Sequence, residues 1–507
     1  MSDYTPDWYQ ILGVSAQAEP EDIRAAYRAL ARRFHPDVNS NPGVGSQFRE
    51  IVSAYGVLND VLERQKYDIK RRSESSDRAL TLRVTLSQRN LTVLSEPQVL
   101  YVLAELLPER AQSLKQMETR LNLMLVLDHS VSMRGQRLER LKVAANQIIE
   151  QLSNQDVFGV VGFSDRAEVI VASKPLTDKA EVRAKVAMIQ AYGGTEIFQG
   201  MQAGMSEARR HASRKYVNHI ILLTDGRTYG DEPQALELAD RAAKEGIGIS
   251  AMGIGDEWND TFLDQLASRT GGTSEYINSP SAVVRFLNDK VRVLGQAYAE
   301  RVKISIAPDS DMKLESAFRL APSAQPIDIQ NDPIMMGALQ LGGIASALFQ
   351  LQISPLATPG FRSLLRIDVT ADMLRQQQFG YKIIQDISTE VVTQPPNDET
   401  PLAIVDALNR LTLYKMQEKA EDAVARGDTR EATRRLENLA TRLFSSGEPE
   451  LAQAAMAEAQ RVSNTSALSD GGQKMLKYGT RLLIGANAGP GSDTGALNNG
   501  AAFDGPS

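Results

Sequence analysis

The spacing of apolar residues divides the chain into regions of different secondary structure. Residues 1–70 show helical spacing, and two amphipathic helices are predicted there. The apolar face of the first is formed by Ile23, Tyr27, Leu30 and Phe34, and that of the second by Phe48, Ile51, Tyr55 and Leu58. A charged, serine-containing stretch follows, so residues 71–78 are interpreted as a linker.

Residues 116–296 alternate short apolar runs with amphipathic segments. The candidate strands are Leu121–Leu127, Val157–Phe163, His219–Thr224 and Gly248–Gly253, and candidate helices between them include Arg137–Leu152 and Glu196–His211. Strands that alternate with helices in this way predict a doubly wound α/β domain with a mostly parallel sheet.

Strand-like patterns lie on both sides of this domain, in residues 79–115 and 297–396. We therefore expect a β-sandwich into which the α/β domain is inserted, because the termini of a domain often lie close together. The predicted fold class is thus multidomain, α plus α/β plus β.

The end of the chain is expected to be helical and then disordered. Residues 397–484 are predicted to form a helical bundle, in which Asp428 and Glu431 make a capping box after Gly427. Residues 485–507 are rich in glycine, asparagine and aspartate, which favours disorder.

Composition narrows the range of functions. The chain has 507 residues, no cysteine and a formal net charge of −7, which excludes disulfides and thiolate metal sites and gives no overall basic field for nucleic acid. The start, Met1-Ser2-Asp3-Tyr4, does not resemble a secretory signal, and the longest apolar runs are too short to cross a bilayer. We expect a cytoplasmic protein without a nucleic-acid or membrane partner.

The first candidate site follows the first helix. Arg24, Arg28 and Arg32 recur at a spacing of four and form a basic row that ends near the turn His35-Pro36-Asp37. Such a row can steer an acidic partner, proline stiffens the turn, and a carboxylate suits a bidentate pair with a partner arginine. Taken alone, the tripeptide is better interpreted as a simple turn in a helical hairpin.

The surrounding motifs resemble the J-domain of DnaJ over residues 7 to 70. They are Tyr9-Gln10-Ile11-Leu12-Gly13-Val14, Tyr27-Arg28-Ala29-Leu30-Ala31, Ala54-Tyr55-Gly56-Val57-Leu58 and Gln65-Lys66-Tyr67-Asp68. The resemblance implies that His35, Pro36 and Asp37, with the arginine row, bind a DnaK-type ATPase and accelerate its hydrolysis of ATP. Phe34 stands where the family often has tyrosine. Neither a Gly/Phe-rich segment nor a cysteine zinc module follows, so selection of a client is expected in the later domains.

The second candidate site collects oxygen atoms at predicted strand ends. Asp128 ends one apolar strand, Asp225 follows another, and Ser130, Ser132 and Thr195 supply hydroxyls from adjoining loops. Side chains at the carboxyl ends of strands in an open α/β sheet can converge. Oxygen-only ligands suit a hard cation, so Mg²⁺ or Mn²⁺ is expected.

In this order the motifs resemble the metal-ion-dependent adhesion site of von Willebrand factor A domains, although each is common by itself. The resemblance implies that Asp128, Ser130, Ser132, Thr195 and Asp225 hold the ion, and that a partner protein supplies an Asp or Glu carboxylate. Val131 departs from the family, which often has glycine there. His129 is interpreted as a loop filler rather than a ligand.

Three functions are compatible with these sites. The favoured one is a non-enzymatic co-chaperone adaptor, which binds a partner through the metal and recruits a DnaK-type chaperone. The alternative is a non-catalytic subunit of an ATP-driven assembly of the MoxR or chelatase type, which a neighbouring ATPase gene would support. A metal-dependent hydrolase is disfavoured, because no general base lies at a telling spacing from the metal motifs.

Overall fold

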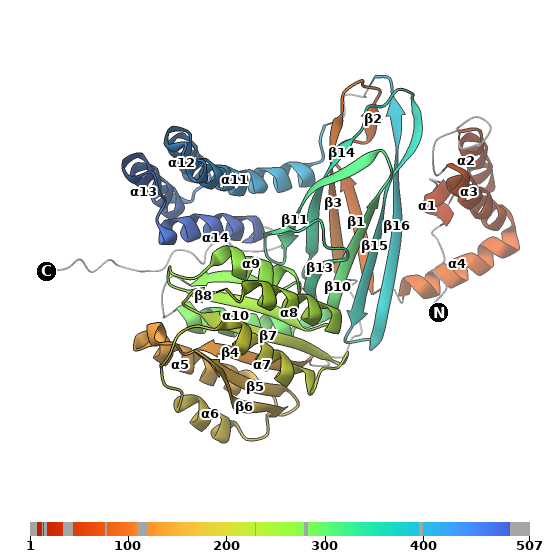
Figure 1. Ribbon diagram of the computed structural model, residues 1–507. Coiled ribbons are helices and arrows are strands. Elements are labelled where there is room, and N and C mark those ends of the chain that lie inside the picture. The colour runs from red at the N-terminus through yellow and green to blue at the C-terminus, as the bar shows by residue number, and fades with distance from the viewer. Residues whose placement is uncertain are drawn as a thin grey trace.

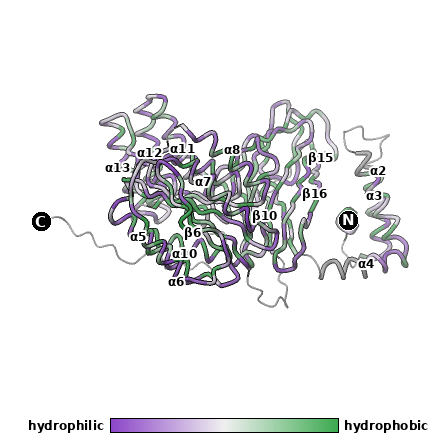
Figure 2. The backbone as a smooth tube through the Cα atoms, turned by 60° about the horizontal axis from the view of Figure 1, so that its bottom comes forward, coloured by the Kyte–Doolittle hydropathy of each residue, from purple (hydrophilic) through white to green (hydrophobic). Residues whose placement is uncertain are grey.

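The computed structural model describes residues 8–12, 14, 18–33, 44–76, 79–108, 119–228, 230–277, 282–394 and 399–486. Two five-stranded sheets stand at the centre of the molecule (Figure 1). The N-terminal helices lie on one side of these sheets, and the α/β domain and the C-terminal helices lie on the other (Figure 1). The tube view in Figure 2 shows the same separation of the N-terminal helices.

Four helices form the N-terminal domain. They are α1 Trp8–Leu12, α2 Pro20–Arg33, α3 Val44–Asn59 and α4 Val61–Ser76. Ile23 of α2 and Ile51 and Leu58 of α3 are buried together, as their helical spacing predicts, and Tyr27 stacks on Tyr55 with ring centroids 3.9 Å apart. The interpretation of residues 71–78 as a linker is wrong for residues 71–76, because α4 continues to Ser76. The arginine and glutamate residues of this stretch favour a helix as much as a solvated loop.

The α/β domain contains one six-stranded sheet. Its strands are β4 Arg120–Asp128, β5 Val157–Phe163, β6 Ala167–Pro175, β7 Tyr216–Thr224, β8 Gly248–Ile254 and β9 Ser274–Ile277. The spatial order is β6-β5-β4-β7-β8-β9, and every pair is parallel except β5–β6. The mostly parallel sheet that the alternation of apolar and amphipathic segments predicts is therefore confirmed.

Helices cover both faces of this sheet, as a doubly wound fold requires. The domain contains the short 3-10 helix η1 Val131–Met133 and the helices α5 Gln136–Gln151, α6 Lys179–Ala187, α7 Ile197–Arg209, α8 Glu232–Glu245, α9 Asp260–Ser268 and α10 Ala282–Gly295. Helices α5, α6 and α10 contribute to one apolar core, and α7, α8 and α9 to the other. Helix α7 approaches the sheet closely at Gly204, where a β-carbon would lie 2.5 Å from Val126.

The β-sandwich is built from both flanks of the inserted domain. One sheet has the order β1 Leu80–Leu86, β3 Gln98–Pro108, β14 Ala345–Ile353, β11 Met312–Ala321 and β12 Gln325–Ile327. The other has the order β13 Ile334–Gln340, β10 Ala297–Pro308, β15 Gly360–Met373, β16 Gln378–Val392 and β2 Asn90–Thr92. Strand β3 pairs with β14, and β2 pairs with β16, so each sheet joins segments from before and after the α/β domain. The predicted insertion is confirmed.

The C-terminal domain has four helices. They are α11 Leu402–Ala425, α12 Thr429–Ser445, α13 Pro449–Thr465 and α14 Asp470–Ala486. The side chain of Asp428 accepts the backbone N–H of Glu431 at 3.0 Å, as the capping box predicts. Helix α14 includes the first two residues of the predicted disordered tail 485–507, and the others lie outside the described residues. Within the part of the chain that the structure describes, no helix has the length and apolar character to cross a membrane.

Helix α14 is attached to the α/β domain by a buried ionic network. The carboxylate of Asp264, in α9, accepts two hydrogen bonds from the guanidinium of Arg481, at 2.9 and 2.7 Å. It also forms an ion pair with Lys477 at 2.8 Å. The hydroxyl of Tyr478 donates to the same carboxylate at 2.9 Å. Burial opposes ionisation of Asp264, but the Arg481 and Lys477 cations hold its pKa well below the usual range. The two domains therefore share a fully charged, densely bonded contact.

We expect Asp264→Asn to lower the free energy of unfolding by about 3 kcal/mol or more, because the buried Arg481 loses its anion and Lys477 keeps only its ion pair with Asp260. The measurement is calorimetric unfolding of the full chain. The matched control is Asp289→Asn, whose exposed ion pair with Arg292 should contribute less than about 1 kcal/mol. Equal effects of the two substitutions would show that the network does not hold the domains together.

Candidate functional site

Two carboxylates meet at the carboxyl end of the central sheet. Strand β4 ends at Asp128, and Asp225 directly follows β7. The two strands are parallel neighbours, with Leu127 opposite Leu223, so their ends lie side by side. Both carboxylates are completely buried. The structure thus brings together the two acidic residues that the sequence placed at strand ends.

Asp128 is held by hydrogen bonds from its surroundings. The backbone N–H of Ser130 donates to Oδ1 at 2.8 Å, and the hydroxyl of Thr224 donates to Oδ2 at 2.6 Å. Burial raises the pKa of Asp128 to about 6, with a further contribution from the negative charge of Asp225, although these hydrogen bonds oppose the rise. Burial is the largest cause of this rise, so the negative charge of Asp128 is poorly solvated at the end of the sheet.

A chain of hydroxyls connects the first loop to Asp225. The Oγ atoms of Ser130 and Ser132 are 2.9 Å apart, and the Ser132 hydroxyl donates to Asp225 Oδ1 at 2.6 Å. Val131, which lies between the two serines, belongs to a 3-10 turn, and its side chain is 49% exposed. A valine is accommodated in this loop because its side chain points to solvent and the turn needs no left-handed backbone.

Thr195 reaches the site from a separate loop. A β-carbon on Gly226 would lie 3.0 Å from Thr195 Oγ1, so the hydroxyl sits against the backbone that follows Asp225. Gly193 has a φ of 73°, and the N–H of Gly194 donates to Asp165 Oδ1 at 2.6 Å, which fixes the turn before Thr195. All five residues selected from the sequence therefore lie at one end of the sheet.

His129 occupies the same loop without facing the hydroxyl chain. Its ring packs against Tyr192, with centroids 4.7 Å apart, and burial lowers its pKa. The backbone N–H of Tyr192 donates to His129 O at 2.9 Å. These contacts join the first loop to the Thr195 loop, which agrees with a filling role for the histidine.

Sequence reasoning missed two residues of the site. Thr224 precedes Asp225 and bonds Asp128, whereas Arg137 of α5 donates from its guanidinium to Asp225 Oδ2 at 2.5 Å. Thr224 could have been noticed from its place at the end of a buried strand. The sequence does not indicate Arg137, which is the second residue of α5. Its guanidinium meets Asp225 only because of the tertiary structure.

The donor set fits a hard divalent cation. It consists of two buried carboxylates and three hydroxyls, with one guanidinium as the nearby positive charge. Magnesium and manganese prefer such oxygen donors. Among the described residues no group of three or more histidine or acidic side chains could hold a metal, so a cation here would depend on the hydroxyls as well.

The arginine row lies on α2. Arg24, Arg28 and Arg32 are exposed, and the guanidinium groups of Arg24 and Arg28 donate to backbone oxygens one turn earlier, at 3.2 and 3.3 Å. The row is therefore accessible to a partner. The remaining residues of this predicted site, His35, Pro36 and Asp37, lie outside the described residues.

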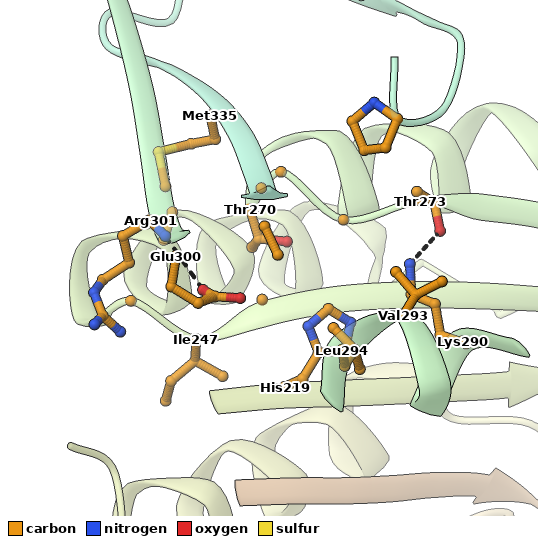
Figure 3. Close-up of a pocket in the computed structure, with 18 residues that line it drawn as sticks. His219, Ile247, Thr270, Thr273, Lys290, Val293, Leu294, Glu300, Arg301 and Met335 are labelled. Atoms are coloured by element: carbon orange, nitrogen blue, oxygen red, sulfur yellow. Dashed lines mark hydrogen bonds between the residues drawn. The ribbon is translucent and has the colours of Figure 1, made fainter. Parts of the chain in front are cut away.

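A cavity with a mixed lining of apolar and ionisable side chains lies at the opposite end of the α/β domain, where β10 enters the sandwich. Figure 3 shows Lys290, Glu300 and His219 around it, with Lys290 donating to Thr273 Oγ1 at 2.7 Å. Burial lowers the pKa of Lys290 to about 8 and raises that of Glu300 to about 7. These groups belong to the joint between the inserted domain and the sandwich, far from the strand ends that carry Asp128 and Asp225.

Three family models match separate parts of the chain. A DnaJ domain matches residues 7–68, a von Willebrand factor type A domain matches residues 122–290, and a Sll0103-like C-terminal alpha-helical domain matches residues 402–486. The uncharacterised protein sll0103 of Synechocystis is 26% identical over 376 residues, which cover 72% of this chain and 88% of that protein. The DnaJ chaperone of Methanosarcina thermophila is 52% identical over 64 residues, which cover 13% of this chain and 16% of the chaperone.

Two solved structures share the architecture. A von Willebrand factor type A protein from Catenulispora acidiphila has a TM-score of 0.61 at 16% identity, covering 79% of this chain and 96% of that one. The ArnB paralog VWA2 from Sulfolobus acidocaldarius has a TM-score of 0.51 at 14% identity, covering 80% and 99% of the two chains. At these identities the likeness concerns the fold alone.

Removing the hydrogen bond between Thr224 and Asp128 tests how much this contact contributes to the stability of the fold. Thr224→Val removes the donor while keeping the shape, and we expect a loss of about 1–3 kcal/mol, because a buried carboxylate loses one of its partners. The measurement is thermal unfolding in EDTA. Thr441→Val, which removes an exposed hydroxyl bonded within its own helix, should change stability by less than about 0.5 kcal/mol. Similar losses from both variants would contradict a special role for Thr224.

Proposed function

We propose, from the DnaJ-type J-domain and the von Willebrand factor type A domain that this chain contains, that the protein is a co-chaperone adaptor. The J-domain recruits a DnaK-type chaperone and stimulates its ATPase, and the A domain holds a partner protein through Mg²⁺ or Mn²⁺. The observation that carries the proposal is the pair of buried carboxylates with adjoining hydroxyls, in a chain that also carries a J-domain. We place this activity in the cytoplasm.

The likeness to DnaJ supports the chaperone contact. It is confined to the J-domain, since the chain spans only 16% of the length of the Methanosarcina chaperone. The exposed arginines of α2 provide a positive surface for an acidic groove on the chaperone. Because the similarity does not extend to the rest of DnaJ, the A domain is the part of the chain that we assign to partner selection.

The geometry of the second site supports a metal-dependent partner contact. Asp128, Ser130, Ser132, Thr195 and Asp225 would hold the cation, and Thr224 would orient the Asp128 carboxylate. A bound cation supplies positive charge and a coordination position for a carboxylate of the partner. The exposed side chain of Val131 beside the serines leaves room for that partner to approach.

The J-domain proposal is tested with the ATPase of a DnaK-type chaperone. We expect the full chain to raise the steady-state rate of ATP hydrolysis and Asp37→Asn to remove that stimulation, because the carboxylate needed for an arginine on the chaperone is lost. Asp386→Asn makes the same chemical change in the β-sandwich and should stimulate like the wild type. Full stimulation by Asp37→Asn would reject the J-domain contact as its source.

The metal proposal is tested by calorimetric titration with Mg²⁺ and Mn²⁺. We expect binding by the wild type and a loss of at least about tenfold in affinity for Asp128→Ala, which removes a buried carboxylate donor. Asp156→Ala is the matched control, because Asp156 is a buried aspartate that accepts hydrogen bonds at the opposite end of the sheet. Equal metal affinity in the wild type and Asp128→Ala would remove the proposed site.

A further inference from the structure

We propose that Arg137 sets the net charge of the metal-loaded site, so that the site binds its cation loosely and requires an anionic ligand from the partner. This inference rests on the proposed metal-dependent function and deepens it. It begins from an ion pair that the sequence motifs do not contain, between Arg137 and Asp225.

The two oxygens of Asp225 have different partners. Oδ1 accepts the hydroxyl of Ser132 at 2.6 Å, whereas Oδ2 accepts the guanidinium of Arg137 at 2.5 Å. The serine hydroxyls and Arg137 therefore lie on different oxygens of one carboxylate. A cation seated among the hydroxyls would approach Oδ1, and Arg137 could keep its contact with Oδ2.

Arg137 is held in this position from two directions. Its guanidinium also lies 3.5 Å from the backbone oxygen of Ser132, and a β-carbon on Gly255 would lie 3.1 Å from its Nη2. Gly255 follows β8 and has a φ of 73°, so glycine is favoured there by both backbone conformation and space. The guanidinium thus lies between Asp225 and the end of a neighbouring strand, and its side chain is 36% exposed.

The charges of the buried groups give the consequence. Asp128 and Asp225 together carry two negative charges, which one divalent cation cancels. Arginine keeps its proton at every physiological pH, so Arg137 leaves the loaded site with one unit of positive charge. Two other nearby charges are exposed and more strongly screened: Arg227 pairs with Asp470 at 3.2 Å, and Asp165 accepts the N–H of Gly194. The buried Asp231 accepts the N–H of Phe198 and the hydroxyl of Thr228, and Glu196 is half-buried.

Two effects follow from this excess charge. Repulsion between the guanidinium and the cation weakens metal binding, and the remaining positive charge strengthens the attraction for a carboxylate. Metal and carboxylate then bind cooperatively, each improving the affinity for the other by the same factor. A partner that presents an Asp or Glu side chain would complete the charge balance, whereas a neutral oxygen ligand would not.

The experiment follows Mn²⁺ binding by electron paramagnetic resonance on the full chain, with and without acetate as the carboxylate probe. We expect Arg137→Gln to bind Mn²⁺ about tenfold more tightly than the wild type without acetate, because the nearby positive charge is gone. Acetate should tighten Mn²⁺ binding by the wild type and have a smaller effect on the variant. Arg140→Gln, an exposed position on the same helix, should behave like the wild type in both conditions.

Unchanged or weaker Mn²⁺ binding by Arg137→Gln would overturn the inference, and so would an equal effect of acetate on the two proteins. Circular dichroism checks that the variant folds, and Arg137→Met serves as a second uncharged variant with the same expectation. Asp128→Ala distinguishes a failure of the metal site from a failure of the role of Arg137. If it binds Mn²⁺ like the wild type, the metal site itself fails, whereas binding that depends on Asp128 but not on Arg137 rejects only the role of Arg137.

Discussion

The burial of Asp128 and Asp225 at the ends of two adjacent strands is the constraint on which the candidate metal centre depends. An ionised carboxylate removed from water is costly unless it is paired and hydrogen-bonded. The surrounding loops meet this requirement with the N–H of Ser130, the hydroxyls of Thr224 and Ser132, and the guanidinium of Arg137. Burial still raises the pKa of Asp128 to about 6, and a bound cation would favour its ionised form.

The rest of the molecule holds this end of the sheet in place. The β-sandwich joins the other end of the α/β domain, and the C-terminal domain packs beside the loops of the candidate metal site. Arg227 lies two residues after Asp225 and pairs with Asp470 at the start of α14, while a β-carbon on Gly471 would lie 2.9 Å from Asp256. The J-domain helices lie on the far side of the sandwich from the α/β domain (Figure 1), so the arginine row and the candidate metal site lie in separate parts of the molecule.

The parts of the fold that depend on local pattern could be predicted from the sequence. Buried parallel strands are continuous apolar runs, which are easily recognised in a sequence. The predicted range of β5 therefore matches the structure. The predicted ranges of β4, β7 and β8 differ from the observed strands by a few residues at their ends. The extension of α4 through a charged stretch was missed, because polar residues at a domain boundary suit a helix and a loop equally well. The positions of Asp128 and Asp225 at strand ends were predictable because each residue directly follows one of these apolar runs.

The contacts that tune the site were not predictable, because they join side chains whose meeting is fixed only by tertiary structure. Asp225 and Arg137 are 88 residues apart, and Asp264 and Arg481 are 217 residues apart. No periodicity or short motif relates such positions. The residue types in the sequence indicated the oxygen donors of the candidate site, but they did not indicate the charged side chains that surround these donors.

The two buried networks differ in that balance, and the difference explains their separate roles. In the joint between the domains, two cations, Arg481 and Lys477, face two carboxylates, Asp264 and Asp260. The cations hold the pKa of Asp264 low, so this contact is balanced in charge. At the strand ends, Arg137 pairs with Asp225, whereas Asp128 is held by the N–H of Ser130 and the hydroxyl of Thr224, and burial raises its pKa to about 6. A network with enough positive charge acts as a fixed joint, whereas a network short of positive charge has the electrostatic character of a cation-binding site. The same rule of charge compensation therefore accounts for the structural role of one cluster and the proposed binding role of the other.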